Sequence, residues 1–452
     1  MNIVIIGDGK VGHKLAVSLS QEEYDVVLID QNENRVKSSV DRLDVMCIQG
    51  NGADVDAQTR AGVPEADIVI ACASADELNM FSCLLAKRLG AARTIARVRN
   101  PIYYKQMDLL KEDLRLSMAV NPELAAANEI ARVLIFPDVN KVEIFFKGRI
   151  ELVEHGLSEN SPLIGLSLAQ IYQKLKINVL ICAIKRGEHV IIPDGNTVIK
   201  NGDVLHIAAS HESLEHFFKT LGNKARKIKK VLICGGGHIS YYLAKELISL
   251  RMKVKIIEIN RERAEQLSDL LPEADIICGD ATKAELLKEE RIGEADALVS
   301  LTGIDEENMI TALYAQSQNI PKVVAKINDD SLDQMARGLG INSTISAKSV
   351  TADAIVSYVR AMNNSAESSN ILTLYRLVNE QVEAAEILIE KEADFINVPL
   401  RDLKMKPNCL IACIGRGKRI LIPGGNDSIQ VGDSVIVITS NQGIDDFTDI
   451  LM

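Results

Sequence analysis

The chain has 452 residues, 47% hydrophobic and 25% charged, a balance typical of globular proteins with roughly two to four domains. Its net charge of -11, its 4% aromatic content and its lack of Trp argue against a nucleic-acid-binding surface. The opening "MNIVIIGDG" lacks the basic start of a signal peptide, and no apolar run approaches the 18 or so residues of a membrane span. We therefore expect a cytoplasmic protein that binds no nucleic acid.

The first part of the chain alternates short apolar runs with amphipathic stretches. The apolar runs are "NIVIIG", "DVVLID", "DVMCIQG", "DIVIACA" and "RTIARV", and "GHKLAVSLSQ" and "NMFSCLLAKRLG" have helical periodicity. Apolar strands joined by helices predict a Rossmann-like α/β domain with a doubly wound parallel sheet. The next stretch, "AVNPELAAANEIARVLIFP", predicts a helix that leaves this domain, capped by Asn121 and closed by Pro137.

The second part of the chain has a different pattern. "NVLICAIKRGEHVIIP" predicts two strands joined by an Arg-Gly turn, and a further strand follows a turn at Asn201-Gly202-Asp203. "SLAQIYQKLK" supplies a short helix. These elements predict a small α+β domain of about 80 residues.

The whole two-domain pattern then occurs again. "IVIIGDGKVGHKLAVSL" returns as "VLICGGGHISYYLAKEL", so that Gly7 and Gly235 lie 228 positions apart, and Asn178 and Asn408 begin a second matching pair 230 positions apart. A nearly constant offset indicates a tandem duplication. We expect polar linkers at 221–230 and 360–370, and four domains with these bounds: Rossmann-like domains at 1–138 and 228–362, and small domains at 141–225 and 370–452.

A glycine-rich loop follows the first strand and opens the first helix. Gly7 permits a tight turn, Gly9 lets a pyrophosphate approach the backbone, and Gly12 lets the helix pack on the strand. Asp30 ends the next strand, where a carboxylate binds a ribose 2′-OH and repels a 2′-phosphate. The pattern predicts a site for NAD(H) or another adenine nucleotide. The loop residues assigned to it are Gly7, Asp8, Gly9, Lys10, Val11 and Gly12.

Further site residues are expected where the other strands end, because ligands of such sheets bind outside the carboxyl ends of the strands. Among them, Arg97 is suited to pair with phosphate. The residues at these ends are Asn51, Gly52, Ala73, Ser74 and Arg97.

The second copy carries an altered loop, because Ser240 stands where the third glycine is expected. Serine is small enough to preserve the fold, and Glu258 retains the ribose acid, but the loss of a glycine predicts a weaker second site than the first. The second set of site residues is Gly235, Gly236, Gly237, His238, Ile239, Glu258, Asp280, Ala281, Thr302 and Lys326.

No catalytic or metal-binding residues are predicted. Tyr172/Lys176 and Tyr241/Lys245 match an acid–base pair of some reductases, but neither is placed at a strand end, and we interpret them as helix-surface residues. Cys409 and Cys413 should point to one face of a strand. Because no second Cys or His pair accompanies them, we do not expect a zinc site.

The order of Rossmann-like and small domains, twice over, resembles the TrkA family, the peripheral regulatory subunits of bacterial Trk-type potassium uptake systems. The motifs that carry the resemblance are "IVIIGDGKVG", "LID" with Asp30, "ARVRNP", "IIPDGNTVIKNGDVL" and "LIPGGNDSIQVGDSVIV", and it covers essentially the whole chain.

The resemblance implies RCK-N (KTN) domains that bind NAD(H), ATP or ADP as regulatory ligands, and RCK-C (TrkA-C) domains for ligand sensing or assembly. It further implies a homo-oligomeric ring, typically a tetramer, on the inner face of the cell membrane, where it gates a TrkH/TrkG-like potassium-translocating subunit. Two alternatives stay open at this point: an NAD-dependent oxidoreductase, and a soluble nucleotide sensor without a membrane partner.

Overall fold

The computed structural model divides the chain into two compact units, each built from both copies. The first unit comprises residues 1–134 and 228–359, and the second comprises residues 135–227 and 360–452. Each copy thus contributes one domain to each unit. The structure describes residues 1–136, 139–175, 178–221, 227–367, 370–378, 381–417, 419–441, 444 and 446–452.

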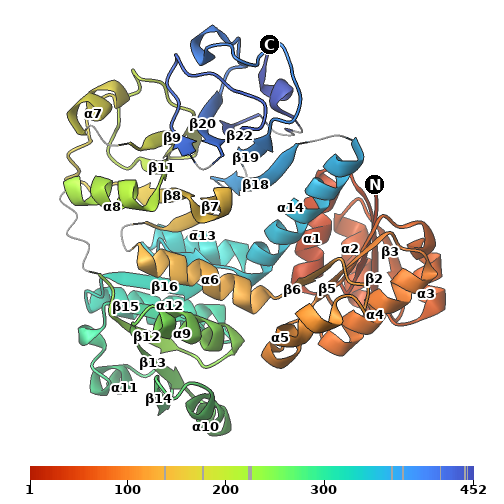
Figure 1. Cartoon of the computed structure of the whole chain (residues 1–452). Helices are drawn as coiled ribbons and strands as arrows, with labels where there is room; N and C mark the ends of the chain where they lie inside the picture. The colour runs from red at the N-terminus through yellow and green to blue at the C-terminus, as the bar shows by residue number, and fades with distance from the viewer. Residues whose placement is uncertain are drawn as a thin grey trace. The chain divides into compact units, whose positions relative to one another are not determined.

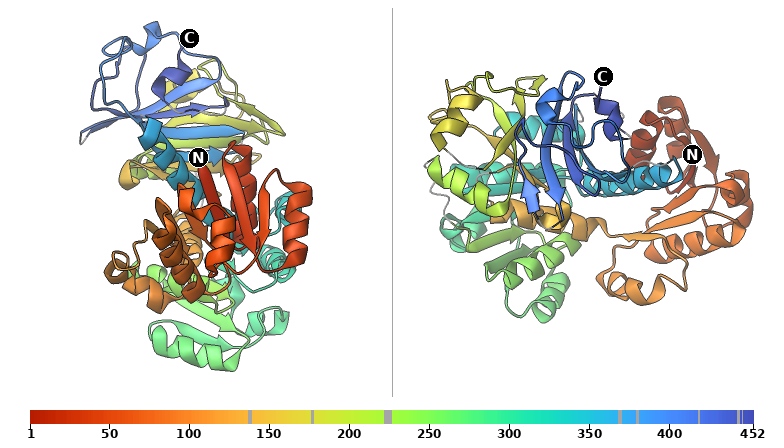
Figure 2. Two further views of the ribbon diagram at one scale, coloured as in Figure 1. Left: turned by 90° about the vertical axis from the view of Figure 1, so that its right-hand side faces the viewer. Right: turned by 45° about the horizontal axis from the view of Figure 1, so that its top comes forward.

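The first Rossmann-like domain is a six-stranded parallel sheet in the order β3-β2-β1-β4-β5-β6. Helices cover both of its faces (Figure 2), so β1 and β4 are almost fully buried. The predicted fold class is confirmed, with a sixth strand that the sequence analysis did not identify. The elements are β1 (Asn2–Ile6), α1 (Lys10–Gln21), β2 (Asp25–Asp30), α2 (Glu33–Arg42), β3 (Met46–Gln49), α3 (Val55–Arg60), η1 (Val63–Glu65), β4 (Ile68–Ala71), α4 (Asp76–Leu89), β5 (Arg93–Arg97), α5 (Pro101–Leu110), β6 (Met118–Val120) and α6 (Pro122–Ile135).

The second Rossmann-like domain repeats this topology as β14-β13-β12-β15-β16-β17 (Figure 1). In both domains the strand order reverses beside the first strand, which places a ligand crevice at the carboxyl ends of β1/β4 and of β12/β15. The elements are β12 (Lys230–Cys234), α9 (His238–Ser249), β13 (Lys253–Glu258), α10 (Arg261–Leu270), β14 (Asp275–Cys278), α11 (Ala284–Glu289), η3 (Ile292–Glu294), β15 (Ala297–Ser300), α12 (Asp305–Ser317), β16 (Lys322–Lys326), α13 (Asp330–Gly338), β17 (Thr344–Ile345) and α14 (Ala347–Glu367).

Helix α6 joins the two Rossmann-like domains. The predicted cap forms, since Asn121 Oδ1 accepts from the Leu124 N–H at 2.9 Å. Its apolar face, including Ile130 and Leu134, packs against Ile233 and other core residues of the second copy. The two crevices therefore belong to one packed unit.

The small domains are five-stranded antiparallel sheets in the orders β10-β9-β11-β8-β7 and β18-β19-β22-β20-β21. The predicted strands and the Arg-Gly turn are present, but each sheet also contains an initial hairpin that we did not predict, β7–β8 and β18–β19. The elements are β7 (Lys141–Phe145), η2 (Phe146–Gly148), β8 (Ile150–Gly156), α7 (Leu168–Leu175), β9 (Leu180–Arg186), β10 (His189–Ile191), β11 (Val204–Ala209), α8 (His211–Thr220), β18 (Ile371–Leu377), β19 (Val382–Leu388), η4 (Leu400–Asp402), β20 (Cys409–Arg416), β21 (Arg419–Leu421), β22 (Ser434–Thr439) and η5 (Phe447–Ile450).

The two small sheets pack face to face within the second unit, and a shared apolar cluster contains Phe145 and Leu152 from one sheet and Ile436 and Ile438 from the other. Figure 2 shows the two sheets side by side. The buried Glu386 carboxylate accepts from the Phe146 N–H at 3.1 Å, so the interface also contains specific polar contacts.

One prediction about the cysteines is wrong. A bulge between Ile411 and Cys413 shifts the register of β20 against β22, so Cys413 joins the cluster between the sheets while Cys409 packs on the opposite side. The extra residue breaks the two-residue alternation on which the prediction relied. All eight cysteines are free thiols.

The expected linkers and domain ends differ in how far the structure tests them. The polar segment 360–370 is helical up to Glu367, as a continuation of α14. Pro137, residues 222–226 of the other linker, and the boundaries at 138 and 225 lie outside the described residues. None of the described helices is long and apolar enough to cross a bilayer.

Candidate functional site

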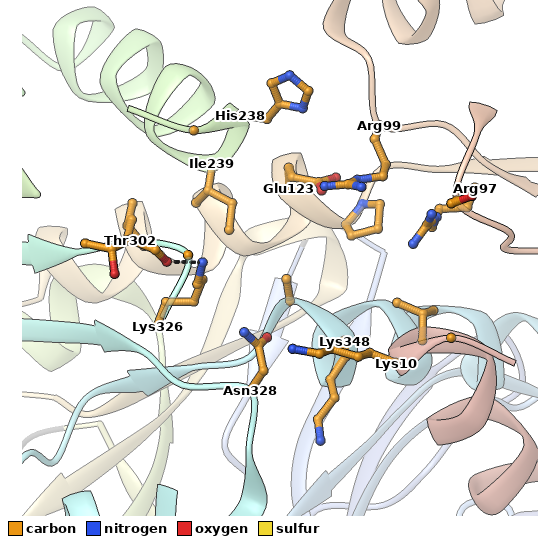
Figure 3. A pocket seen from close by; sticks show the side chains of 18 of the residues that line it. Lys10, Arg97, Arg99, Glu123, His238, Ile239, Thr302, Lys326, Asn328 and Lys348 are labelled. Atoms are coloured by element: carbon orange, nitrogen blue, oxygen red, sulfur yellow. Dashed lines mark hydrogen bonds and ion pairs between the residues drawn. The ribbon is translucent and has the colours of Figure 1, made fainter. Parts of the chain in front are cut away.

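Both crevices open into one cavity of about 1250 Å³ within the first unit. Figure 3 shows side chains of both copies pointing into it. The predicted residues that line it are Gly7, Gly9, Lys10, Val11, Asp30, Gly52, Ala73, Ser74, Arg97, Gly235, Gly236, Gly237, His238, Ile239, Glu258, Asp280, Ala281, Thr302 and Lys326.

The first glycine loop has the geometry that a phosphate loop requires. Gly7 has φ 100°, and a Cβ there would lie 2.7 Å from the Ala73 nitrogen. Gly9 precedes α1 in an extended conformation, and no atom lies within 4 Å of the position of a Cβ, so its exposed backbone is open to a ligand. A Cβ on Gly12 would lie 1.9 Å from the Gly7 oxygen. The free N–H groups at the start of α1 can therefore face an anion.

Asp30 is held by the loops around it. Its carboxylate accepts from the Asp8 N–H at 2.7 Å and from the Asn32 N–H at 2.8 Å. The Arg35 guanidinium lies 3.7 Å away. These donors fix the carboxylate at the end of β2, beside the glycine loop, where a ribose hydroxyl can donate to it.

Three predicted residues do not line the cavity. The Asp8 side chain turns toward α1 and α2, where it accepts from Ser39 Oγ at 2.6 Å and contacts His13 Nδ1 at 3.2 Å. Gly12 packs on the loop behind the cavity wall. Asn51 is engaged in its own turn and accepts from the Ala53 N–H at 3.0 Å.

The second loop retains the shape of the first in spite of Ser240. Gly235 has φ 101°, and Gly237 precedes α9 with φ -68° and ψ -171°, close to the -82° and -172° of Gly9. Ser240 is fully buried and its Oγ donates to the Gly235 carbonyl. In the first copy, Cys72 Sγ donates to the equivalent Gly7 carbonyl at 3.4 Å. The serine thus replaces a contact that a neighbouring strand supplies in the first copy.

Glu258 holds the second loop as Asp30 holds the first. Its carboxylate accepts from the Gly236 N–H at 2.6 Å and from the Asn260 N–H at 2.7 Å. Asp280 lies in a turn where it accepts from the Thr282 N–H and hydroxyl, which lowers the pKa of its carboxyl.

Arg97 and Lys326 occupy equivalent positions at the ends of β5 and β16. Arg97 Nη2 donates to the Ala73 carbonyl at 2.6 Å, and Lys326 Nζ donates to the equivalent Thr302 carbonyl. Burial lowers the pKa of both groups. Arg97 Nε is buried and has no hydrogen-bond partner among the described residues, so one donor of the guanidinium is unused.

Sequence reasoning missed six charged residues in the cavity wall, which are Arg35, Arg99, Glu123, Arg263, Glu307 and Lys348. Arg99 follows β5, and its Nε donates to Glu123 on the first turn of α6. Arg263, on α10, donates to the Gly236 carbonyl at 2.9 Å. Lys348 lies on the first turn of α14. Glu123 and Lys348 lie beyond the last strand of each copy, and an alignment of the two copies through these strand ends could have identified them.

The two Tyr-x-x-x-Lys patterns do not form acid–base sites at the cavity. Tyr172 packs against the core of a small domain and its oxygen accepts from the Ile181 N–H at 3.0 Å, while burial raises its pKa to about 12. Tyr241 packs on the core of the second Rossmann-like domain. Both are partly buried core residues, contrary to the surface interpretation, and Lys176 lies outside the described residues. Within the described ranges, no cluster of three or more His, Cys, Asp or Glu side chains is placed to hold a metal.

Domain families and full-length relatives match this chain. The TrkA-N domain family matches residues 3–122 and 231–347, and the TrkA-C domain family matches residues 152–222 and 384–452. A protein of Archaeoglobus fulgidus described as a Trk system potassium uptake protein TrkA homolog is 33% identical over 450 residues, 100% of both chains. The Trk system potassium uptake protein TrkA of Vibrio alginolyticus is 30% identical over 446 residues, 98% of this chain and 96% of its own.

Solved structures share the fold. The GsuK channel bound to NAD has a TM-score of 0.63 at 18% identity and covers 97% of this chain and 76% of its own. GsuK bound to ADP has a TM-score of 0.52 at 15% identity and covers 79% of this chain and 69% of its own. At these identities the similarity concerns the arrangement of the domains.

Proposed function

Because the chain belongs to the TrkA family, as its motifs indicated and the domain and full-length matches confirm, we propose that it is the nucleotide-sensing regulatory subunit of a Trk-type potassium uptake system. The observation that carries this proposal is the single cavity into which both glycine loops open. Two loops of the same shape facing one cavity suit a device that binds ligands without converting them.

The proposed ligands are NAD(H), ATP and ADP. The carboxylates of Asp30 and Glu258, at the ends of β2 and β13, supply the ribose acceptors. The helix starts at Lys10 and His238 supply donors for phosphate. The GsuK structures with NAD and with ADP support this choice of ligands on a related fold. We propose no catalytic residues in the cavity.

The proposed partner is a TrkH/TrkG-like potassium-translocating membrane subunit, on whose inner face a homo-oligomeric ring, a tetramer, assembles. In this proposal the domains at 1–138 and 228–362 sense nucleotide, and the domains at 141–225 and 370–452 serve assembly or further sensing. The names of the TrkA relatives support the potassium system.

Gating follows from a shift between two arrangements of the paired Rossmann-like domains. A ligand changes the populations only by the difference in its affinity for the two states. To move a ratio of 1:99 to 99:1 requires about a 10⁴-fold preference, and two sites that each prefer one state about 100-fold supply it together. Helix α6 begins in the cavity wall and ends at Ile135, where the chain enters the second unit, so it connects the ligand site covalently to the small domains.

The test is potassium flux through a TrkH-like subunit reconstituted in liposomes, with and without this chain. We expect NAD(H), ATP or ADP to change the flux only when the chain is present, and a variant with Asp30→Ala and Glu258→Ala to abolish that response. Equal flux with and without the chain at saturating nucleotide would contradict the proposed function. Oxidation or reduction of the nicotinamide by the purified chain together with a small substrate would favour the oxidoreductase alternative.

A further inference from the structure

The first turns of α6 and α14 carry opposite charges at equivalent positions. Strands β6 and β17 pair with the ends of β5 and β16 in the same way, and Glu123 and Lys348 follow at the same distance along the chain. One copy therefore has an acid where the other has a base. The pairs that fix the equivalence are Arg97 with Val120 and Lys326 with Ile345.

Lys348 adds positive charge to the first glycine loop. Figure 3 shows it beside Lys10, the first residue of α1, although the two belong to different copies. Its side chain is 16% exposed, and Nζ lies 3.0 Å from Asp330 Oδ1. The Leu332 N–H donates to Asp329, and with the charges of Lys348 and Lys10 it lowers the pKa of that carboxyl. Two ammonium groups thus lie in the cavity wall beside the first loop, and that of Lys348 is paired with Asp330.

Glu123 has the opposite effect at the second loop. It is 7% exposed; Oε1 accepts from Arg99, and Oε2 has no hydrogen-bond partner among the described residues. His238 stands where the first loop has Lys10. Burial lowers the pKa of His238, and the charge of Glu123 partly opposes this. Arg263 and Arg99 also lower the pKa of His238, and Asp76 raises it.

We propose that this charge inversion assigns different nucleotides to the two loops: the first binds ATP or ADP, and the second binds the dinucleotide NAD(H). A terminal phosphate carries about -1.5 to -2 charge at pH 7. Each phosphate in the pyrophosphate bridge of a dinucleotide has one ester and one anhydride bond, and therefore carries a single charge. The terminal phosphate is stabilised by Lys10 and Lys348 at the first loop and repelled by the free Glu123 oxygen at the second. The assignment rests on the proposed binding of nucleotide at both loops.

The test is calorimetric titration with ATP, ADP and NADH in a chelator, so that the nucleotides carry their full charge. Asp30→Ala isolates the second loop and Glu258→Ala isolates the first. We expect Lys348→Glu to weaken ATP binding at the first loop at least tenfold and NADH binding at the second loop less than threefold. Glu123→Lys should strengthen ATP binding at the second loop by a similar factor. Lys253→Glu, at the amino end of β13 and so at the opposite end of the strand from Glu258, is the control for net charge and should change neither affinity.

The conservative variants Lys348→Gln and Glu123→Gln keep the test decisive where a charge reversal impairs folding, and we expect the same directions with smaller factors. Unchanged ATP-to-NADH selectivity in folded variants, with nucleotide still bound at both loops, would overturn this assignment and leave the proposed function standing. A wild-type chain that binds none of the three nucleotides would overturn both. A lysine variant that loses ATP and NADH equally would show a general structural role and also overturn the assignment.

Discussion

Exchanging the residues that differ between the two glycine loops should destabilise the first copy about twice as much as the second. A Cβ at Gly12 would lie 1.9 Å from the Gly7 oxygen and 3.0 Å from Cys72 Sγ, where ordinary contacts are 3.4–4 Å. In the second copy, Ser240 fits and donates to the Gly235 carbonyl. Gly12→Ser therefore forces α1 away from β1, whereas Ser240→Gly removes a contact and introduces no clash.

The magnitudes follow from these contacts. Overpacking typically costs about 1–3 kcal/mol, and the upper end applies because α1 is anchored by the fully buried Leu15 and Leu19. At about 2–4 °C per kcal/mol, Gly12→Ser should lower the melting temperature by about 6–12 °C. Ser240→Gly loses one hydrogen bond, about 1 kcal/mol, and places glycine in a helix, about 0.5–1 kcal/mol, so its shift should be roughly half as large.

Nucleotide binding separates the two variants further, because displacement of α1 moves the N–H groups that face the phosphates. Gly12→Ser should lose the first-loop nucleotide and retain the second, while Ser240→Gly should retain both. Scanning calorimetry gives the melting temperatures, and equilibrium dialysis gives the number of nucleotides bound per chain. The reasoning is refuted if Gly12→Ser melts within 1 °C or so of wild type and binds normally, or if Ser240→Gly is the more damaged variant.

Three further predictions concern other parts of the chain. Asp30→Ala should weaken adenine-nucleotide binding at the first loop, and Glu258→Ala should remove less of the total nucleotide bound. Calorimetry that shows unchanged affinity in a folded Asp30→Ala variant would contradict the assignment of Asp30 to the first nucleotide site. Asp203 is fully buried and accepts from Arg186 at 2.7 Å through both carboxylate oxygens. Asp203→Ala should therefore cost about 3 kcal/mol in thermal unfolding. Burial acts to raise the pKa of Asp203, but the Arg186 hydrogen bond holds this pKa below its ordinary value. The stabilisation by the ion pair is therefore complete above about pH 4 and is lost as the pH falls below that value. A melting temperature that does not fall in acid would count against this prediction. Asn121→Ala removes the cap of α6 and a 2.9 Å hydrogen bond to Tyr242. It should lower the free energy of unfolding by about 1–2 kcal/mol in urea titrations, and no change would show that the cap is dispensable.

The sequence predicted the parts of the fold that local chemistry determines. Gly7, Gly9 and Asp30 follow or end buried strands at a spacing that few other structures require, and the same pattern recurs in the second copy. The initial hairpin of the second small domain was missed because Glu383 and Glu386, both buried in β19, interrupt the apolar pattern that marks a buried strand.

What could not be predicted depends on contacts between the copies. Nothing local to "NPELAAANEIARVL" indicates that α6 packs on the sheet of the other copy, so Glu123 was not assigned to a site. The bulge at Ile411 and Cys413 was missed for a related reason, since one extra residue in a strand leaves no mark on its composition.

Duplication within one chain permits an asymmetry that a symmetric dimer of a single copy cannot have. In such a dimer, any residue on the first turn of the crossing helix would occur at both loops, so an acid at one would be an acid at both. Here Glu123 and Lys348 vary independently. Because each loop faces a helix start that follows the last strand of the other copy, a nucleotide at either proposed site would contact both copies. Under the proposed function, binding at one loop would therefore change the arrangement in which the other ligand binds, and such coupling is reciprocal. Two loops with different charge can thus compare two nucleotide pools, where two identical loops would respond twice to the same one.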